Sequence, residues 1–432
     1  MLLDKINRIN VKMLMSVGHQ LLTAVYGFSV LIILYRYAAK AEIGRWLIIS
    51  SAVSLLDMLM HGFLQTVVIR KLSMENPAVK WVNTIASNAL FFSLSLWLIA
   101  SILILSASLI FSGNVLLSDL RWYLVLGVAM AFYNVSWWVG NARTQFGSVL
   151  AQRLIFSLIS MNCILFFVLH KGSISIENLM MAQIAGYATG SVITLLFINN
   201  IKISYKLVDR GYLKYFFGYG KFTSGSMLMG SLLRNADVFM IAAFMNENAV
   251  AVYGTAQKTV EIFEVALRGM ASHALPDFCK NATQFKSLIK KYIHTVTTLL
   301  LFSLPVAVLM FVFSDQVIHL LSGSNAYEGS SVILKIFMGY VLFLIVDRMT
   351  GVMLEAMGLA RYNLVKTILL VVVNVAGNFI ALYFFKSLPG VAMVSILAAI
   401  TGIISGAYFI IRNSGLLLTR QQIRNGFNLV LK

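Results

Sequence analysis

Ionisable side chains recur at helical spacing inside the apolar runs of this sequence, where charge is costly. In the run at residues 43–67, Asp57 and His61 stand four positions apart, so they share one helical face. In the run at 249–274, a second face carries Lys258, Glu261, Glu264 and Arg268. An ionisable group at the centre of a bilayer costs about 2.5–3.5 kcal/mol, so such groups normally face a cavity or a partner. The pattern predicts a polar cavity that binds a charged ligand.

Cations dominate the predicted polar interior. We expect a hydrated cleft between two helical bundles, lined by Arg234, Lys258, Arg268, Arg348 and, when protonated, His61. Such a cleft suits an anionic ligand, because guanidinium groups match the geometry of a phosphate or diphosphate. The alternative is a set of structural ion pairs, namely Lys258 with Glu261, Arg268 with Glu264, and Arg234 with Asp237.

Acids and aromatic residues in the same runs suggest further roles. The candidate coupling or gating acids are Asp57, Glu264, Asp237 and Asp347. An embedded carboxylate could exchange a proton or a sodium ion during transport. Trp138 and Tyr340 could stack on sugar rings, and aromatic packing is the alternative use.

The sequence favours neither an enzyme nor a metalloprotein. Its two cysteines, Cys163 and Cys279, stand in no Cys-x-x-Cys or Cys/His spacing, and no nucleotide-binding Gly-x-x-x-x-Gly-Lys-Ser/Thr loop occurs. We therefore expect no cofactor, no metal site and no catalytic residues. Transport could still be coupled to the movement of H⁺ or Na⁺.

The elements that must position these residues are membrane-spanning helices. Hydrophobic residues make up 59% of the chain and charged residues only 12%. A spanning helix needs about 20 apolar residues, and about twelve such runs can be placed. They are residues 11–36, 43–67, 82–110, 122–140, 149–170, 179–197, 222–244, 249–274, 292–313, 332–353, 363–385 and 391–411. The predicted fold class is an all-α integral membrane protein.

The distribution of basic residues predicts the orientation. The first segment and every second gap after it hold about 23 of the 34 lysines and arginines, whereas the alternate gaps hold about 7. This bias predicts that both termini are cytoplasmic. The net charge of +18 then reflects topology and attraction to anionic membrane lipids, and we expect no nucleic-acid partner.

A weak internal repeat predicts that the chain consists of two structurally similar halves. Shifting the chain by 207 residues places Asp57 on Glu264, and it places His61-Gly62 on Arg268-Gly269. We therefore expect two six-helix bundles, at residues 1–199 and 222–432, the second with a cytoplasmic tail. A basic cytoplasmic linker at 200–221 would join them. In many transporters the substrate site lies at such a repeat interface.

Short motifs in a fixed order along the whole chain carry a family likeness. They are Ile43-Gly44-Arg45-Trp46, Leu56-Asp57, His61-Gly62, Arg234 to Asp237, Val252-Tyr253, Pro276, Glu355-Ala356-Met357-Gly358, Asn374, Asn378, and Leu388-Pro389-Gly390-Val391-Ala392. With them the chain resembles the Wzx-type polysaccharide flippases of the polysaccharide biosynthesis protein family. That family belongs to a superfamily with the MATE multidrug exporters and the lipid II flippases. One departure is Ala251, where a glycine is common.

The resemblance implies a MATE-like fold and a flippase of the bacterial cytoplasmic (inner) membrane. The implied substrate is an undecaprenyl-diphosphate-linked oligosaccharide repeat unit, as in O-antigen and lipopolysaccharide biosynthesis, moved by alternating access. A polysaccharide polymerase and a chain-length regulator become candidate partners. One alternative is a MATE-like, cation-coupled exporter of small molecules, although the cationic excess disfavours it. The other is a membrane-embedded glycan polymerase or ligase, which usually has a large external loop with basic catalytic residues; the longest external stretch here is residues 314–331, with only His319.

Overall fold

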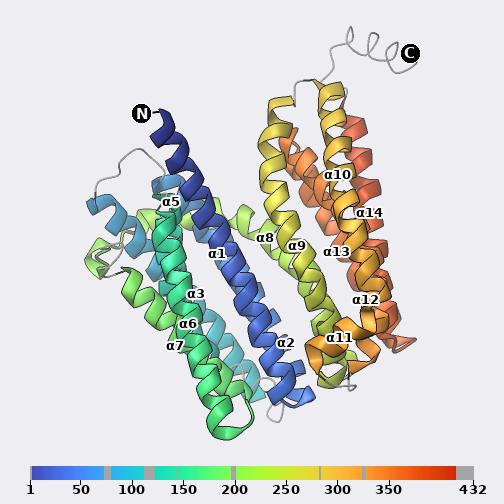
Figure 1. Ribbon diagram of the computed structural model, residues 1–432. Helices are drawn as coiled ribbons and strands as arrows, with labels where there is room; N and C mark the ends of the chain where they lie inside the picture. The colour runs from blue at the N-terminus through green and yellow to red at the C-terminus, as the bar shows by residue number, and fades with distance from the viewer. Residues whose placement is uncertain are drawn as a thin grey trace. The chain divides into compact units, whose positions relative to one another are not determined.

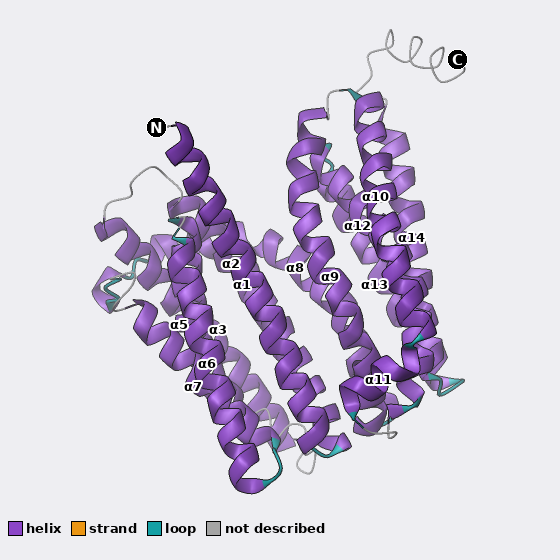
Figure 2. Ribbon diagram, in the orientation of Figure 1, coloured by secondary structure: helices purple, strands orange, loops and turns teal. Residues whose placement is uncertain are grey.

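The fold is entirely helical wherever the chain is described. The structure is a computed structural model that describes residues 2–72, 79–110, 122–143, 145–195, 201–281, 284–323 and 327–414. Within these ranges the regular elements are helices joined by short loops (Figure 2). The predicted all-α fold is therefore confirmed.

The chain divides into two compact units, Met1–Ser231 and Leu232–Lys432, called here the N unit and the C unit. The division falls inside helix α8 (Arg210–Phe244). The domain bounds expected from the sequence, 1–199, 200–221 and 222–432, stay a prediction.

The N unit is a bundle in which helices distant in the sequence also pack on one another (Figure 1). Its other α-helices are α1 (Leu2–Tyr37), α2 (Lys40–Leu72), α3 (Val79–Ile110), α5 (Tyr123–Ala142), α6 (Phe146–Lys171) and α7 (Ile176–Ile193). Helix α5 contacts α2, α3 and α7, and α6 contacts α1 and α7. Gly172 ends α6 in the left-handed conformation, at φ 65°, which glycine adopts without strain. The hydroxyl of Ser175 then caps α7 by accepting from the Asn178 backbone N–H.

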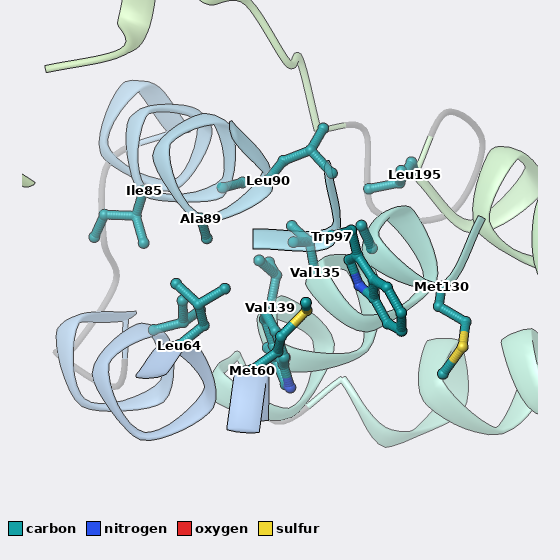
Figure 3. Close-up of a cluster of buried hydrophobic side chains, with 14 of the residues drawn as sticks. Met60, Leu64, Ile85, Ala89, Leu90, Trp97, Met130, Val135, Val139 and Leu195 are labelled. Atoms are coloured by element: carbon teal, nitrogen blue, oxygen red, sulfur yellow. The ribbon is translucent and has the colours of Figure 1, made fainter. Parts of the chain in front are cut away.

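Close side-chain packing holds α2, α3 and α5 together. Figure 3 shows Leu64 of α2, Leu90 and Trp97 of α3, and Val135 of α5 in one buried cluster. A Cβ on Gly127 of α5 would come within 2.5 Å of the Trp97 ring, so the glycine lets the indole lie against the helix. Lipid tails are as apolar as these side chains, so helix association in a membrane depends on such close fits.

The C unit contains the last six described α-helices. They are α9 (Glu247–Asn281), α10 (Phe285–Val312), α11 (Ser314–Ser322), α12 (Gly329–Ala356), α13 (Ala360–Tyr383) and α14 (Leu388–Ser414). Helix α12 is central, because it contacts α9, α10 and α14. Helix α13 packs along α14.

Length and composition make the chain a multi-pass membrane protein. Eight helical segments in the described residues are apolar and long enough to span a bilayer. They are Lys40–Ile69, Val79–Leu103, Phe146–Lys171, Met227–Phe244, Phe285–Val312, Gly329–Ala356, Ala360–Tyr383 and Leu388–Ser414. Large apolar side chains also point outward, such as Leu169 at 82% and Phe302 at 76% exposure, which a lipid environment explains.

A short segment at residues 201–209 is fixed to helix α3 in the N unit. The side chains of Asn83 and Ser87 accept hydrogen bonds from the backbone N–H groups of Lys202 and Ser204, both at 3.1 Å. The amide of Asn88 binds the same segment twice: it accepts from Asp209 N at 2.9 Å and donates to the Leu207 carbonyl at 2.9 Å. We call this set of four hydrogen bonds the linker clamp.

Candidate functional site

A half-buried acid in the N unit, Asp57, has partners on two helices. Asn134 of α5 donates to Asp57 Oδ1 of α2 at 2.8 Å. His61 lies one turn along α2, with its Nδ1 at 3.4 Å from the same carboxylate oxygen and 2.9 Å from the Asp57 carbonyl. The predicted shared face of Asp57 and His61 is therefore confirmed, and Asn134 completes the group.

Trp138 covers this group from α5. Its ring stands edge-on to the His61 ring, with centroids 5.3 Å apart, and its side chain is 0% exposed. A sugar could stack on this indole only if the protein atoms around it moved away. In the conformation described, Trp138 packs against histidine.

A cation of the N unit, Arg153, lies in the spanning helix α6. Its guanidinium carbon lies 4.6 Å from the Phe156 ring centroid and 5.3 Å from that of Tyr26. Tyr133 and Tyr187 extend this aromatic box, since their ring centroids are 5.1 Å apart and Tyr187 lies 4.4 Å from Phe156. The Arg153 Nε is buried and has no hydrogen-bond partner among the described residues.

Sequence reasoning missed Arg153. An arginine five residues into an apolar run carries the same signal as the other embedded cations, so it could have been found by counting charges. The aromatic box could not have been found from the sequence, because its rings come from four different helices, α1, α5, α6 and α7. Stacked rings stabilise a cation without neutralising its charge, so the guanidinium stays able to bind an anion.

The most completely enclosed acid of the C unit is Asp237 of α8. The Tyr253 hydroxyl of α9 and the Asn378 amide of α13, at 2.7 Å, both donate to it. Ser395 of α14 lies 3.5 Å from Asp237 Oδ2. These partners come from α9, α13 and α14, so the carboxylate on α8 is held inside the unit by oxygen and amide groups. The expected pairing of Asp237 with Arg234 is not among the ion pairs of the described residues.

The surroundings of Asp237 are rich in oxygen atoms that could bind a small cation. The Asn374 side-chain oxygen accepts from Asn378 at 3.2 Å. The Asn378 side-chain oxygen is buried without a hydrogen-bond partner in the described part of the chain. Carboxylate, amide and hydroxyl oxygens are the ligands that hard cations prefer.

Asp347 forms a buried ion pair that the sequence did not predict. Lys366 of α13 donates to Asp347 Oδ1 of α12 at 2.6 Å and to the Asp347 carbonyl at 3.0 Å. Lys366 is only 3% exposed. Gly402 and Gly406 of α14 pack directly over this pair, and a Cβ at either position would overlap it or its neighbour Thr350. The pair therefore joins three helices of the C unit.

The remaining predicted residues of the C unit lie in different surroundings. Lys258 pairs with Glu261 at 2.5 Å on α9, as the structural alternative expected. Arg234 is half-buried on α8, and its carbonyl accepts from the side chain of Gln257 at 2.9 Å.

Glu264 and Tyr340 are half-buried and Arg348 is exposed. The side chain of Arg268 lies outside the described residues. The predicted cationic cleft that would contain these groups stays a prediction.

Sequence comparison relates the chain to glycan transport. Residues 33–330 match the profile of a family described as polysaccharide biosynthesis protein. The probable low-salt glycan biosynthesis flippase Agl15 of Haloferax volcanii is 24% identical over 250 residues, which cover 56% of this chain and 51% of that protein. The chain thus matches about half the length of this curated relative.

Several solved structures share the fold. An inward-facing MATE family multidrug transporter of the MOP superfamily has a TM-score of 0.76 at 18% identity, over 90% of this chain and 94% of that one. The lipid II flippase MurJ, in an inward closed conformation, has a TM-score of 0.72 at 14% identity, over 92% and 87%. A MOP superfamily transporter from Pyrococcus furiosus, described by the reverse polarity of its binding pocket, has a TM-score of 0.65 at 17% identity, over 94% and 96%. These likenesses confirm the predicted MATE-like fold.

The buried pair of the C unit should contribute strongly to stability. Replacing Lys366 by Met leaves the Asp347 carboxylate buried without its cation, so the free energy of unfolding should fall by about 3–5 kcal/mol. The matched control is Lys335→Met, which breaks the exposed pair with Asp315, 3.4 Å long, and should cost at most about 1 kcal/mol. Denaturant unfolding of the purified protein in detergent measures both. Equal stability of the two variants would contradict a structural role for the Lys366–Asp347 pair.

Proposed function

The chain belongs to the polysaccharide biosynthesis protein family, and from this we propose that it is a flippase for a lipid-linked oligosaccharide. The proposed substrate is an oligosaccharide repeat unit on undecaprenyl diphosphate, and the proposed location is the bacterial inner membrane with both termini in the cytoplasm. The protein acts by alternating access and makes or breaks no covalent bond. The similarity to a glycan biosynthesis flippase and the shared fold with a lipid II flippase support this proposal.

The observation that best supports the proposal is the environment of the Arg153 guanidinium. A guanidinium inside an apolar helix is expensive, and here it stacks on aromatic rings instead of pairing with a carboxylate of the described residues. Its buried Nε has no hydrogen-bond partner among the described residues, so a ligand could use this donor once the surrounding side chains move. A diphosphate supplies both the negative charge and the several acceptor oxygens that a guanidinium binds best. The box of Tyr26, Tyr133, Phe156 and Tyr187 offers rings and hydroxyls beside that charge.

The polyprenyl tail and the sugars of the proposed substrate need different surroundings. The polyprenyl tail is apolar and stays in the bilayer, so only the diphosphate and sugars need a polar path. Arg234, Lys258, Arg268, Arg348 and protonated His61 are the further proposed cations of that path. Trp138 and Tyr340 remain the proposed sugar contacts. A polysaccharide polymerase and a chain-length regulator are proposed partners, because they would use the translocated lipid-linked product.

Asp237 is the proposed coupling site. Its carboxylate is enclosed by a tyrosine hydroxyl, an asparagine amide and a serine hydroxyl, with a free amide oxygen on Asn378. A proton or a sodium ion could be held there, since either would balance the buried negative charge. Because α8, α9, α13 and α14 all contribute, ion binding can change how these helices pack and so bias transport. Asp57 and Glu264 are proposed as gating acids, and Asp347 is already neutralised by Lys366.

A second candidate is a cation-coupled exporter of small molecules. The shared fold with MATE family transporters favours it. Such an exporter would take cationic drugs, whereas the aromatic box of the N unit is already occupied by the side-chain cation of Arg153. The flippase is therefore the better-supported function.

Arg153 provides the sharpest test of substrate binding. The Arg153→Gln variant should translocate undecaprenyl-diphosphate oligosaccharide in proteoliposomes at least about tenfold more slowly, because a hydrogen bond to a charged group is worth about 1.5–3 kcal/mol. The matched control is Arg412→Gln, since Arg412 is exposed at the end of α14 and binds only Tyr408, at 3.3 Å, among the described residues. The initial rate at which labelled lipid becomes accessible to an impermeant reagent measures both variants.

Stability separates this role from a structural one. Arg153→Gln should lower the free energy of unfolding far less than Lys366→Met does, since it removes ring contacts but leaves no buried carboxylate of the described residues unpaired. Transport at the wild-type rate by this variant would remove Arg153 from the substrate path.

Asp237 provides the test of coupling. The transport rate of the wild-type protein should rise with an imposed gradient of sodium ions or of protons. In Asp237→Asn this stimulation should be at least about tenfold smaller, because the variant keeps the shape of the side chain but removes its charge. Asp277→Asn, which alters an exposed acid paired with Lys291 at 3.3 Å, is the matched control and should respond like the wild type. An undiminished ion response in Asp237→Asn would place coupling elsewhere.

A further inference from the structure

A basic groove lies at one end of the N unit, apart from the groups proposed for transport. Its volume is about 650 Å³, and its lining includes the ammonium-bearing side chains of Lys80, Lys202 and Lys206. Lys80 stands at the start of α3, and the other two belong to the segment at residues 201–209. We call it the lysine groove. No acidic residue is among the described residues that line it.

The lysine groove is a fixed feature, because the linker clamp builds one of its walls. Asn83 and Ser204 both line the groove and both take part in the clamp. On the other side of the segment, Ile201 is buried in the core of the N unit. Hydrogen bonds and apolar burial therefore hold the backbone that carries Lys202 and Lys206. Fixing the backbone that carries these lysines removes the part of the entropy cost of binding that would come from ordering the segment.

The groove lies at the level where a membrane meets water. Val79 lines it and is also the first residue of the spanning segment Val79–Leu103. Trp81 and Tyr212 lie beside it in sequence and pack edge-on, with ring centroids 5.7 Å apart, as aromatic residues do at membrane interfaces. Burial and the neighbouring Asp209 carboxylate raise the pKa of Tyr212, so this phenol adds no negative charge. Phosphate groups of membrane lipids lie at the same depth.

We propose that the lysine groove binds a terminal phosphate group, either the phosphate monoester headgroup of an anionic phospholipid or free inorganic phosphate. Three ammonium groups offer up to nine N–H donors and three positive charges. A phosphate monoester carries about −1.5 to −2 charge and three terminal acceptor oxygens, whereas a phosphodiester carries one charge and two such oxygens. The groove therefore prefers the monoester. This site does not depend on the proposed transport function.

Native mass spectrometry of the purified full chain in detergent tests the proposal. With phosphatidic acid as probe, the wild type should retain one lipid molecule more tightly than it retains phosphatidylglycerol, a phosphodiester of similar size. The triple variant K80Q/K202Q/K206Q should bind phosphatidic acid at least about tenfold more weakly, since each lysine near an anionic group contributes about a factor of five before screening. These side chains are exposed, so the variant should fold normally.

A second triple variant controls for net charge. K214Q/K286Q/K290Q removes three exposed lysines that do not line the groove, so it should bind phosphatidic acid like the wild type. Competition by millimolar inorganic phosphate distinguishes the sources: effective competition indicates that the phosphate alone is bound, and weak competition indicates a lipid headgroup with its chains. Equal binding by the two triple variants, or no preference for the monoester, would overturn the proposal.

Discussion

A charge among apolar helices must be neutralised, hydrogen-bonded or given a ligand, and the interior of both units follows from this constraint. Asp57 accepts from Asn134, and Asp237 accepts from a tyrosine and an asparagine. Lys366 and Asp347 neutralise one another under two glycines of α14. Arg153 differs from all of these, because rings surround it and its charge stays available. That difference separates groups that hold helices together from a group suited to an anionic substrate.

Sequence periodicity predicted the features that depend on one helix. Hydropathy gave the all-α membrane fold, and steps of three and four residues gave the contacts of Asp57 with His61 and of Lys258 with Glu261. Periodicity predicts which face of a helix is polar, but it does not predict which other helix that face contacts.

The features that the sequence did not predict are contacts between distant helices. Asn134 reaches Asp57 across 77 positions and Asn378 reaches Asp237 across 141. Lys366 and Arg153 were not predicted for a related reason, since the groups that surround each of them come mostly from other helices. Such partners depend on how each helix is rotated in its bundle.

In the proposed transport process the two units offer different chemistry. The N unit supplies a cation in an aromatic box, which suits a diphosphate and sugars, and the C unit supplies an enclosed carboxylate, which suits a small cation. The proposed substrate site and the proposed coupling site lie in different units, so mutations should be able to change one without the other. Outside the spans, the clamped basic segment carries the lysine groove, for which a phosphate ligand is proposed.

The most direct test of the central claim is the leaflet distribution of undecaprenyl-diphosphate oligosaccharide in cells depleted of this protein and then re-supplied with it. The flippase account predicts that the lipid accumulates on the cytoplasmic face during depletion and reaches the outer face again after re-supply. An unchanged distribution during depletion, together with altered sensitivity to cationic drugs, would contradict the account and favour the exporter.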